Sequence, residues 1–129
     1  MSLAKLEGGS MDSILTSIKK LLGPEELYEH FDPDIILHIN SVFMILTQLG
    51  VGPTEGFTIK DKSSLWTDFV PEKNVEAVKT YVYLKVKLIF DPPSSSFVLE
   101  SMKETIKELE WRLNVAVNTS PEEEIQHDE

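Results

Sequence analysis

The stretch FDPPSSSFVLESMKETIKELEWRLNVAV, Phe90 to Val117, decides how the C-terminal part of the chain folds. Two consecutive prolines end the preceding helix, because a residue before proline is disfavoured in the helical conformation. The serines at 94–96 can cap the next helix, whose 20 or so residues give a length of roughly 30 Å. Its apolar stripe is spaced alternately by three and four residues, which is typical of a helix that packs along another helix. The stripe consists of Leu99, Met102, Ile106, Leu109, Leu113 and Ala116.

Trp111 lies well off this stripe, next to charged residues and Val115. A tryptophan on the polar side of a helix can anchor a contact with another protein. Alternatively, it folds under residues 50–73 or under the first helix of the same chain. The sequence leaves both interpretations open.

The segment from about Asn74 to Phe90 is apolar around most of its circumference, which predicts the central helix of the fold. Lys85 falls within the apolar arc, where an unpaired ammonium group would be costly to bury. Its stem can lie on apolar surface while the head reaches water or a carboxylate. The alternative is a salt bridge to another subunit.

A further helix is predicted to begin at Asp32 and to stop at Gly50. Asp32 is expected to be its N-cap, with Pro33 at the first helical position and Asp34 near the positive end of the helix dipole. The apolar residues of this segment recur at helical spacing and form one continuous core stripe. The stripe comprises Ile35, Ile39, Val42, Leu46 and Leu49, widened by Ile36 and Phe43.

Leu37 and Met44 fall in the middle of the opposite, polar face of this helix. They are seven residues apart and therefore lie on the same side of the helix. An apolar patch on a polar face is typical of a contact surface for another protein. We therefore treat Leu37 and Met44 as candidate interface residues. As for Trp111, the alternative is that they pack under residues 50–73 or under the first helix of the same chain.

The remaining segments are a short helix at the N-terminal end and a turn-rich stretch. The sequence DSILTSIKKLLG places Ile14, Leu15, Ile18, Leu21 and Leu22 on one helical face. Residues 50–73 contain several glycines and predict a short hairpin or an ordered loop. The aromatic residues in that stretch, Phe57, Trp66 and Phe69, are expected to pin it to the helices. Together these patterns predict an all-α fold, a small bundle of about four helices with this loop or hairpin between the second and third.

Length and charge indicate one acidic domain. The 129 residues, 41% of them hydrophobic, suffice for one core. We expect a cloning-derived or flexible leader at 1–10, a helical domain at 11–117 and an acidic disordered tail at 118–129. The net charge is −10 and half of it lies in the tail, so binding to a phosphate backbone is disfavoured. No apolar run reaches the roughly 20 residues that cross a bilayer.

The residue types that carry chemistry form no recognisable site. The chain has no cysteine, and its three histidines do not have a metal-binding spacing. No nucleophile is paired with a base in any known motif. We expect no enzymatic activity, no metal and no cofactor.

Three stretches carry a resemblance to a known family. They are DPDIILHINSVFMILTQLGVGPTEGF, SLWTDF and NVEAVKTYVYLKVKLIFDPPSSSFVLESMKETIKELEWRLNV. In this order they resemble the small head-tail connector proteins of tailed phages and of prophages in Gram-positive bacteria. The similarity covers roughly residues 11–117, and its most specific parts are HINSVFMILTQLGVGP, KLIFDPPSSSFV and ELEWRLNV. These are structural residues and not a catalytic signature.

The resemblance implies a structural protein of the virion, located at the head-tail junction and in the host cytoplasm during assembly. Such a protein forms a ring with copies of itself beneath the portal protein and presents a platform to a further head-completion or tail protein. DNA would pass through the ring without specific binding, and no membrane is involved. The proposed interface residues are Leu37, Met44, Lys85, Trp111 and Val115.

Two other classes of function fit the same residues. One is a small helical regulatory or adaptor module that binds a single partner protein through these patches. The other is an enzyme subunit whose active site is completed by another chain. Self-association and binding to a portal protein distinguish the connector from both.

Overall fold

The computed structural model describes residues 13–23 and 29–118. Within them the helices are α2 (Ile14–Leu22), α3 (Asp32–Gln48), α4 (Trp66–Phe69), α5 (Val75–Phe90) and α6 (Ser96–Asn118). Short 3₁₀ turns at Glu29–Phe31 and Glu72–Asn74 precede α3 and α5. No strand occurs in the described ranges, so the predicted all-α fold is confirmed. The leader expected at 1–10 lies outside these ranges. Of the tail expected at 118–129, Asn118 is the last residue of α6 and the rest lies outside.

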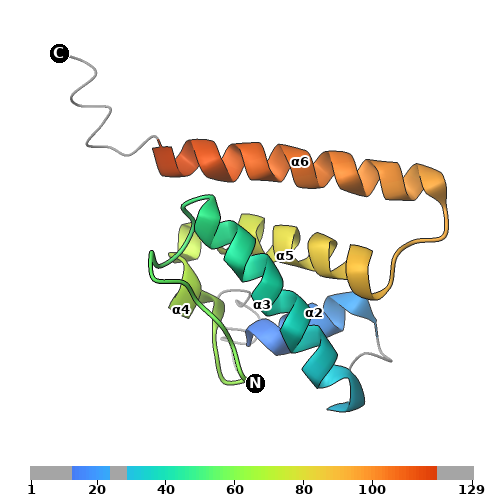
Figure 1. The fold of residues 1–129 in the computed structure, drawn as a ribbon, viewed down its shortest axis with the longest axis horizontal. Helices are drawn as coiled ribbons and strands as arrows, with labels where there is room; N and C mark the ends of the chain where they lie inside the picture. The colour runs from blue at the N-terminus through green and yellow to red at the C-terminus, as the bar shows by residue number, and fades with distance from the viewer. Residues whose placement is uncertain (1–12, 24–28, 119–129) are drawn as a thin grey trace, which may run out of the picture.

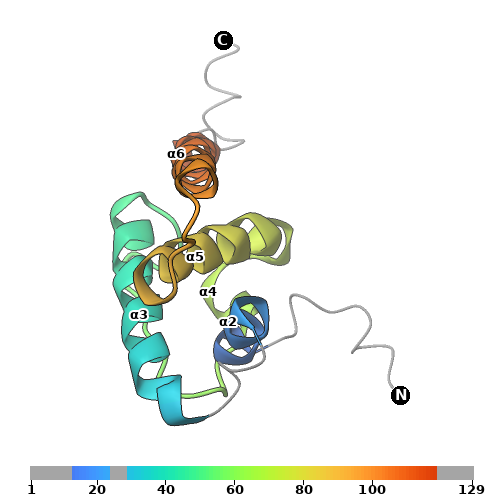
Figure 2. The same ribbon diagram turned by 90° about the vertical axis from the view of Figure 1, so that its right-hand side faces the viewer.

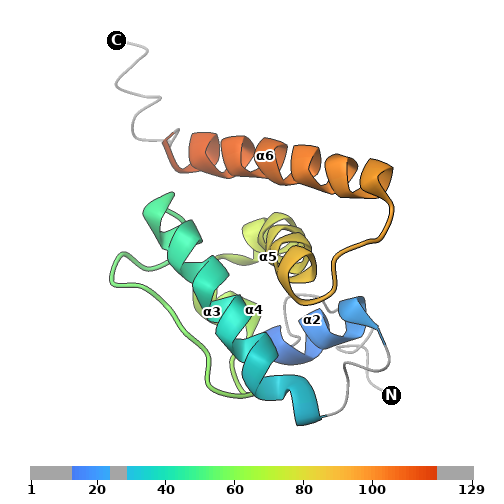
Figure 3. The same ribbon diagram turned by 45° about the vertical axis from the view of Figure 1, so that its right-hand side comes forward.

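Helix α5 is the centre of the bundle, as predicted (Figure 1). It contacts each of the other four helices. Helices α2 and α3 lie on one side of α5, whereas α6 runs along the other side as a separate layer (Figures 2 and 3). As a result, α6 turns one face towards α5 and leaves its outer face uncovered.

The core is formed where α2, α3, α4 and α5 meet. Its largest fully buried side chains are Trp66, Tyr81 and Phe43, which come from three different helices. Burial of such aromatic side chains contributes about 1.5–3 kcal/mol each, which favours one fixed arrangement of the helices. The other fully buried residues are Ile14, Ile18, Ile35, Ile39, Leu46, Val42, Val75, Val78, Val82 and Val86.

The start of α3 differs from the prediction. The N-cap position is held by Phe31 without a side-chain hydrogen bond, and Asp32 is already the first helical residue. The Asp32 carboxylate instead lies 2.6 Å from the ammonium group of Lys19 on α2. Because Lys19 is almost entirely buried, the pairing with α2 outweighs the cap that the local sequence favours. Helix α2 brings a second correction, since Leu21 is exposed and does not belong to the buried face.

Residues 50–65 form an ordered loop that leads into α4, and the hairpin alternative is wrong for this part of the chain. The loop is pinned by its aromatic residues, as expected, and Trp66 also donates a 2.7 Å hydrogen bond to Ser17 Oγ on α2. A polar contact that sequence analysis did not predict comes from Asn40 on α3. Its side chain accepts a 2.8 Å bond from the backbone N–H of Ile59 and donates a 3.0 Å bond to the carbonyl oxygen of the same residue.

Gly52 allows the loop to pass close to α4. Its φ of +86° lies in the region that favours glycine. A Cβ at this position would come within 2.4 Å of the Phe69 ring. Gly56 has a similar φ of +96° but open space around it. The two glycines thus share a backbone requirement, and only Gly52 has a steric one.

Helix α6 packs through the predicted stripe, but less deeply than the other long helices. Among residues 96–117 only Ile106 and Leu113 are buried, whereas Ala116 at the end of the stripe is exposed. Ser95 caps the helix through a 3.3 Å bond from the N–H of Val98, in agreement with the predicted serine cap. Across the layer, the hydroxyl of Tyr81 donates a 2.7 Å hydrogen bond to a carboxylate oxygen of Glu110 and so fixes α6 on α5.

A candidate protein interface on helices α3 and α6

Four of the five predicted interface residues are exposed. The exposed fraction is 62% for Leu37 and 59% for Met44 on α3, and 66% for Trp111 on α6. Val115, one turn beyond Trp111, is also exposed. Single exposed apolar residues are common on protein surfaces, whereas a group that lines one surface, as Leu37 and Met44 do, is typical of a site that another protein covers.

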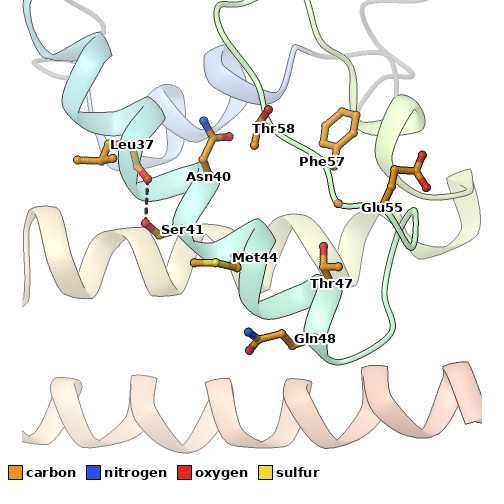
Figure 4. Close-up of a pocket in the computed structure, with 10 residues that line it drawn as sticks. Leu37, Asn40, Ser41, Met44, Thr47, Gln48, Glu55, Phe57 and Thr58 are labelled. Atoms are coloured by element: carbon orange, nitrogen blue, oxygen red, sulfur yellow. Dashed lines mark hydrogen bonds between the residues drawn. The ribbon is translucent and has the colours of Figure 1, made fainter.

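Leu37 and Met44 line a groove of about 600 Å³ along the outer face of α3 (Figure 4). Its other wall is the loop segment 55–58, which contributes Phe57. Phe57 is itself held by the core, because its ring lies 5.5 Å from that of Phe43 between centroids. The groove therefore has an apolar lining on a rigid base, as sites for apolar side chains commonly do.

The rim of this groove is polar and nearly uncharged. Figure 4 shows the side chains of Ser41, Thr47 and Gln48 beside Met44 on α3, with Glu55 and Thr58 on the loop. Among the described residues that line the groove, only Glu55 carries a charge. A ligand for this groove would therefore combine an apolar centre with a neutral or cationic edge.

Trp111 lies on the outer face of α6, away from α5. Its 66% exposure excludes the alternative that it folds under residues 50–73 or under α2. Two turns of charged side chains precede it, including Glu104, Lys107 and Glu108, all of them exposed. Apart from Val115, the nearest neighbours of the indole on this face are charged.

Lys85 is half-buried on α5, and the structure does not bring it into the groove with Leu37 and Met44. Its ammonium group lies 6.0 Å from the centroid of the Tyr81 ring, at the limit of a cation–π contact. In the described part of the chain Lys85 makes no ion pair. This geometry agrees with an apolar stem and a solvated head.

Sequence analysis missed a second apolar patch, at the corner between α5 and α6. Ile89, Phe97 and Val98 are all exposed there, and Phe97 is the most exposed at 79%. The signal was present in the sequence, because Phe97 and Trp111 are fourteen residues apart and therefore lie on the same face of α6. The outer face of α6 thus carries an aromatic group near each end.

Titratable groups with shifted pKa values serve the structure. The pKa of Asp61 is lowered, chiefly by hydrogen bonds from the side chain and the backbone of Ser63. Burial, and then the hydrogen bond to Glu110, raise the pKa of Tyr81.

Within the described residues no group of three or more metal-binding side chains occurs. None of the helices described is long and apolar enough to span a membrane.

Comparison with known proteins gives one result. Neither the curated proteins nor the solved structures contain a match to this chain. The family model described as phage connector protein matches residues 14–120. The match includes the five helices of the described ranges and the loop that forms one wall of the groove. The chain therefore belongs to the phage connector protein family.

Proposed function

We propose that this chain is a subunit of a ring-shaped head-tail connector that joins the portal protein of a phage head to the tail. Membership of the connector family makes it a structural phage protein. The observation that carries the finer proposal is the exposure of Leu37, Met44 and Trp111 on two different helices. A subunit of a ring needs contact surfaces for its neighbours, and additional ones for the proteins above and below.

The charge of the chain supports the role of a DNA conduit. A net charge of −10 makes binding to the phosphate backbone unfavourable, so DNA would slide past the ring without being held. The work of the protein is then mechanical and requires no catalytic group. We place it at the head-tail junction of the virion, and in the host cytoplasm while the particle is assembled.

The partners follow from this position. They are other copies of the chain, the portal protein and a further head-completion or tail protein. The three exposed patches, in the α3 groove, around Trp111 and at the α5–α6 corner, offer separate surfaces for separate partners. Lys85 and Val115 are proposed to contribute to these contacts at their edges.

The test is the mass of the purified protein over a concentration series, alone and mixed with the portal protein of the same phage. Light scattering coupled to gel filtration should show a ring, or a complex that elutes with the portal. Assembly only in the presence of the portal would also support the proposal. A monomer that never binds the portal would contradict it and favour a regulatory or adaptor module.

A further inference from the structure

We propose that neighbouring subunits make a heterologous contact, in which Trp111 of one copy enters the α3 groove of the next. The inference rests on the proposed function, because it describes how copies of the chain associate in a ring. The occupant of the groove is thus a second copy of this chain. Figure 4 shows the groove that would receive the indole.

The groove has room for an indole, and its lining suits one. Its volume is about 600 Å³, and it is open to solvent. Met44 and Phe57 supply a flexible thioether and an aromatic ring, both of which pack well against an indole. In the isolated chain Trp111 is 66% exposed and the groove is open, so each surface lacks what the other provides.

Each surface carries one charge that can pair with a charge on the other. Glu104 and Glu108 also lie beside Trp111, and Glu108 is already paired with Arg112. Glu55 is the charged residue of the groove among those described. Lys107 lies one turn before Trp111, is exposed, and makes no ion pair within residues 13–23 and 29–118. When the indole enters the groove, the Lys107 ammonium can approach the Glu55 carboxylate. Opposite charges at the edge of an apolar contact fix its orientation and disfavour wrong pairings.

The same charges disfavour the symmetric alternative, in which two α6 helices pair through their outer faces. That face carries Glu104 between its aromatic ends, together with Glu108, which is paired with Arg112 at 2.7 Å. Antiparallel pairing centred on this face would bring the Glu104 carboxylates of the two copies together, which is unfavourable. A contact between α6 and α3 keeps the two copies of Glu104 apart.

Trp111 and the groove lie on different helices, and this has a geometric consequence. Each copy carries one exposed Trp111 and one groove, so a bound pair still has one free groove and one free Trp111. Contacts of this type propagate, and they end only when the rotation between neighbours closes a ring. The inferred contact is therefore suited to a ring and unsuited to a closed dimer.

The test uses cysteines at the two surfaces, because the natural chain contains none. Gln48 is exposed on the groove, and Glu108 is exposed one turn from Trp111. A chain with both Gln48→Cys and Glu108→Cys, treated with a short bismaleimide in the presence of the portal, should yield a ladder of covalent multimers. The two single-cysteine proteins should give almost no product alone and only dimers when they are mixed.

Trp111→Ala in the double-cysteine chain should weaken association at least tenfold, as truncation of an aromatic anchor does. Leu21→Ala is the matched control, since Leu21 is an exposed apolar residue on α2, away from both surfaces. It should leave the ladder unchanged. Thermal unfolding followed by circular dichroism checks that each variant is folded.

Two outcomes would overturn the inference and leave the proposed function intact. One is co-elution with the portal without cross-linking between positions 48 and 108. The other is efficient cross-linking of the Glu108→Cys protein to itself, which would indicate a symmetric contact. Loss of both portal binding and self-association would instead refute the proposed function together with the inference.

Discussion

The two tryptophans of the chain occupy opposite environments, so the same substitution should have opposite effects. Trp66 is fully buried and donates a hydrogen bond to Ser17, whereas Trp111 is mostly exposed. Removing a buried tryptophan costs about 3–5 kcal/mol, because apolar contacts are lost and a cavity remains. Removing an exposed side chain that makes no core contact usually changes the free energy of unfolding by less than about 0.5 kcal/mol. Trp66→Ala should therefore be strongly destabilising and Trp111→Ala nearly neutral.

The assay is urea unfolding followed by circular dichroism, because the substitutions remove the fluorescent side chains themselves. It should be carried out at a protein concentration where the chain is monomeric, so that assembly does not contribute to the measured stability. If Trp66→Ala fails to fold, Trp66→Phe keeps a ring in the core and should show a smaller loss. A loss of more than about 2 kcal/mol for Trp111→Ala would mean that Trp111 packs within the monomer, which would refute the interface argument.

Three further predictions concern the stability of the monomer and use the same unfolding assay. Gly56→Ala should lower the free energy of unfolding by about 1–2 kcal/mol, because of backbone strain. Gly52→Ala should lower it by about 1–3 kcal/mol more than Gly56→Ala, because its new methyl group meets an aromatic ring. Equal losses for the two variants would contradict the steric argument. The pKa of Tyr81 is raised from 10.0 in the folded chain, so its stabilising contribution is complete below about pH 10 and is lost as the pH rises through the folded pKa. Tyr81→Phe should accordingly flatten the loss of stability above pH 10, and an unchanged slope would argue against the shift. Asp32→Asn should cost about 1–3 kcal/mol because it leaves the Lys19 ammonium unpaired, and Lys19→Met in the same chain should recover part of that loss.

The helices could be predicted because their signals are local. Apolar periodicity showed the long helices, and prolines and glycines indicated where they stop. The central position of α5 followed from its apolar circumference, since only a helix covered on most sides can be apolar on most sides. The exposure of Leu37 and Met44 followed from the same reasoning, applied to the polar face of α3.

Most of the errors and omissions involve residues far apart in the chain. The exposed patch at the α5–α6 corner is the exception, because its residues lie close together in the sequence. Asp32 has a good local sequence for an N-cap, but its partner Lys19 lies on another helix. Leu21 lies at the edge of its apolar face, and within the described part of the chain it is exposed. The groove beside α3 depends on the path of the 55–58 loop, which helical periodicity does not describe. The sequence showed one side of the candidate interface, and the structure was needed for the other.

The bond pair between Asn40 and Ile59 has a consequence for which amino acids this position can accept. The side-chain amide offers the loop backbone one donor and one acceptor, as an adjacent β-strand would. Asp at this position would keep only the acceptor when ionised, and Gln would displace the amide by one methylene group. Ser and Thr are too short to span both atoms. The Asn40 amide thus binds the loop backbone as a neighbouring strand would. The shape of one wall of the groove therefore depends on a residue that none of these amino acids can replace.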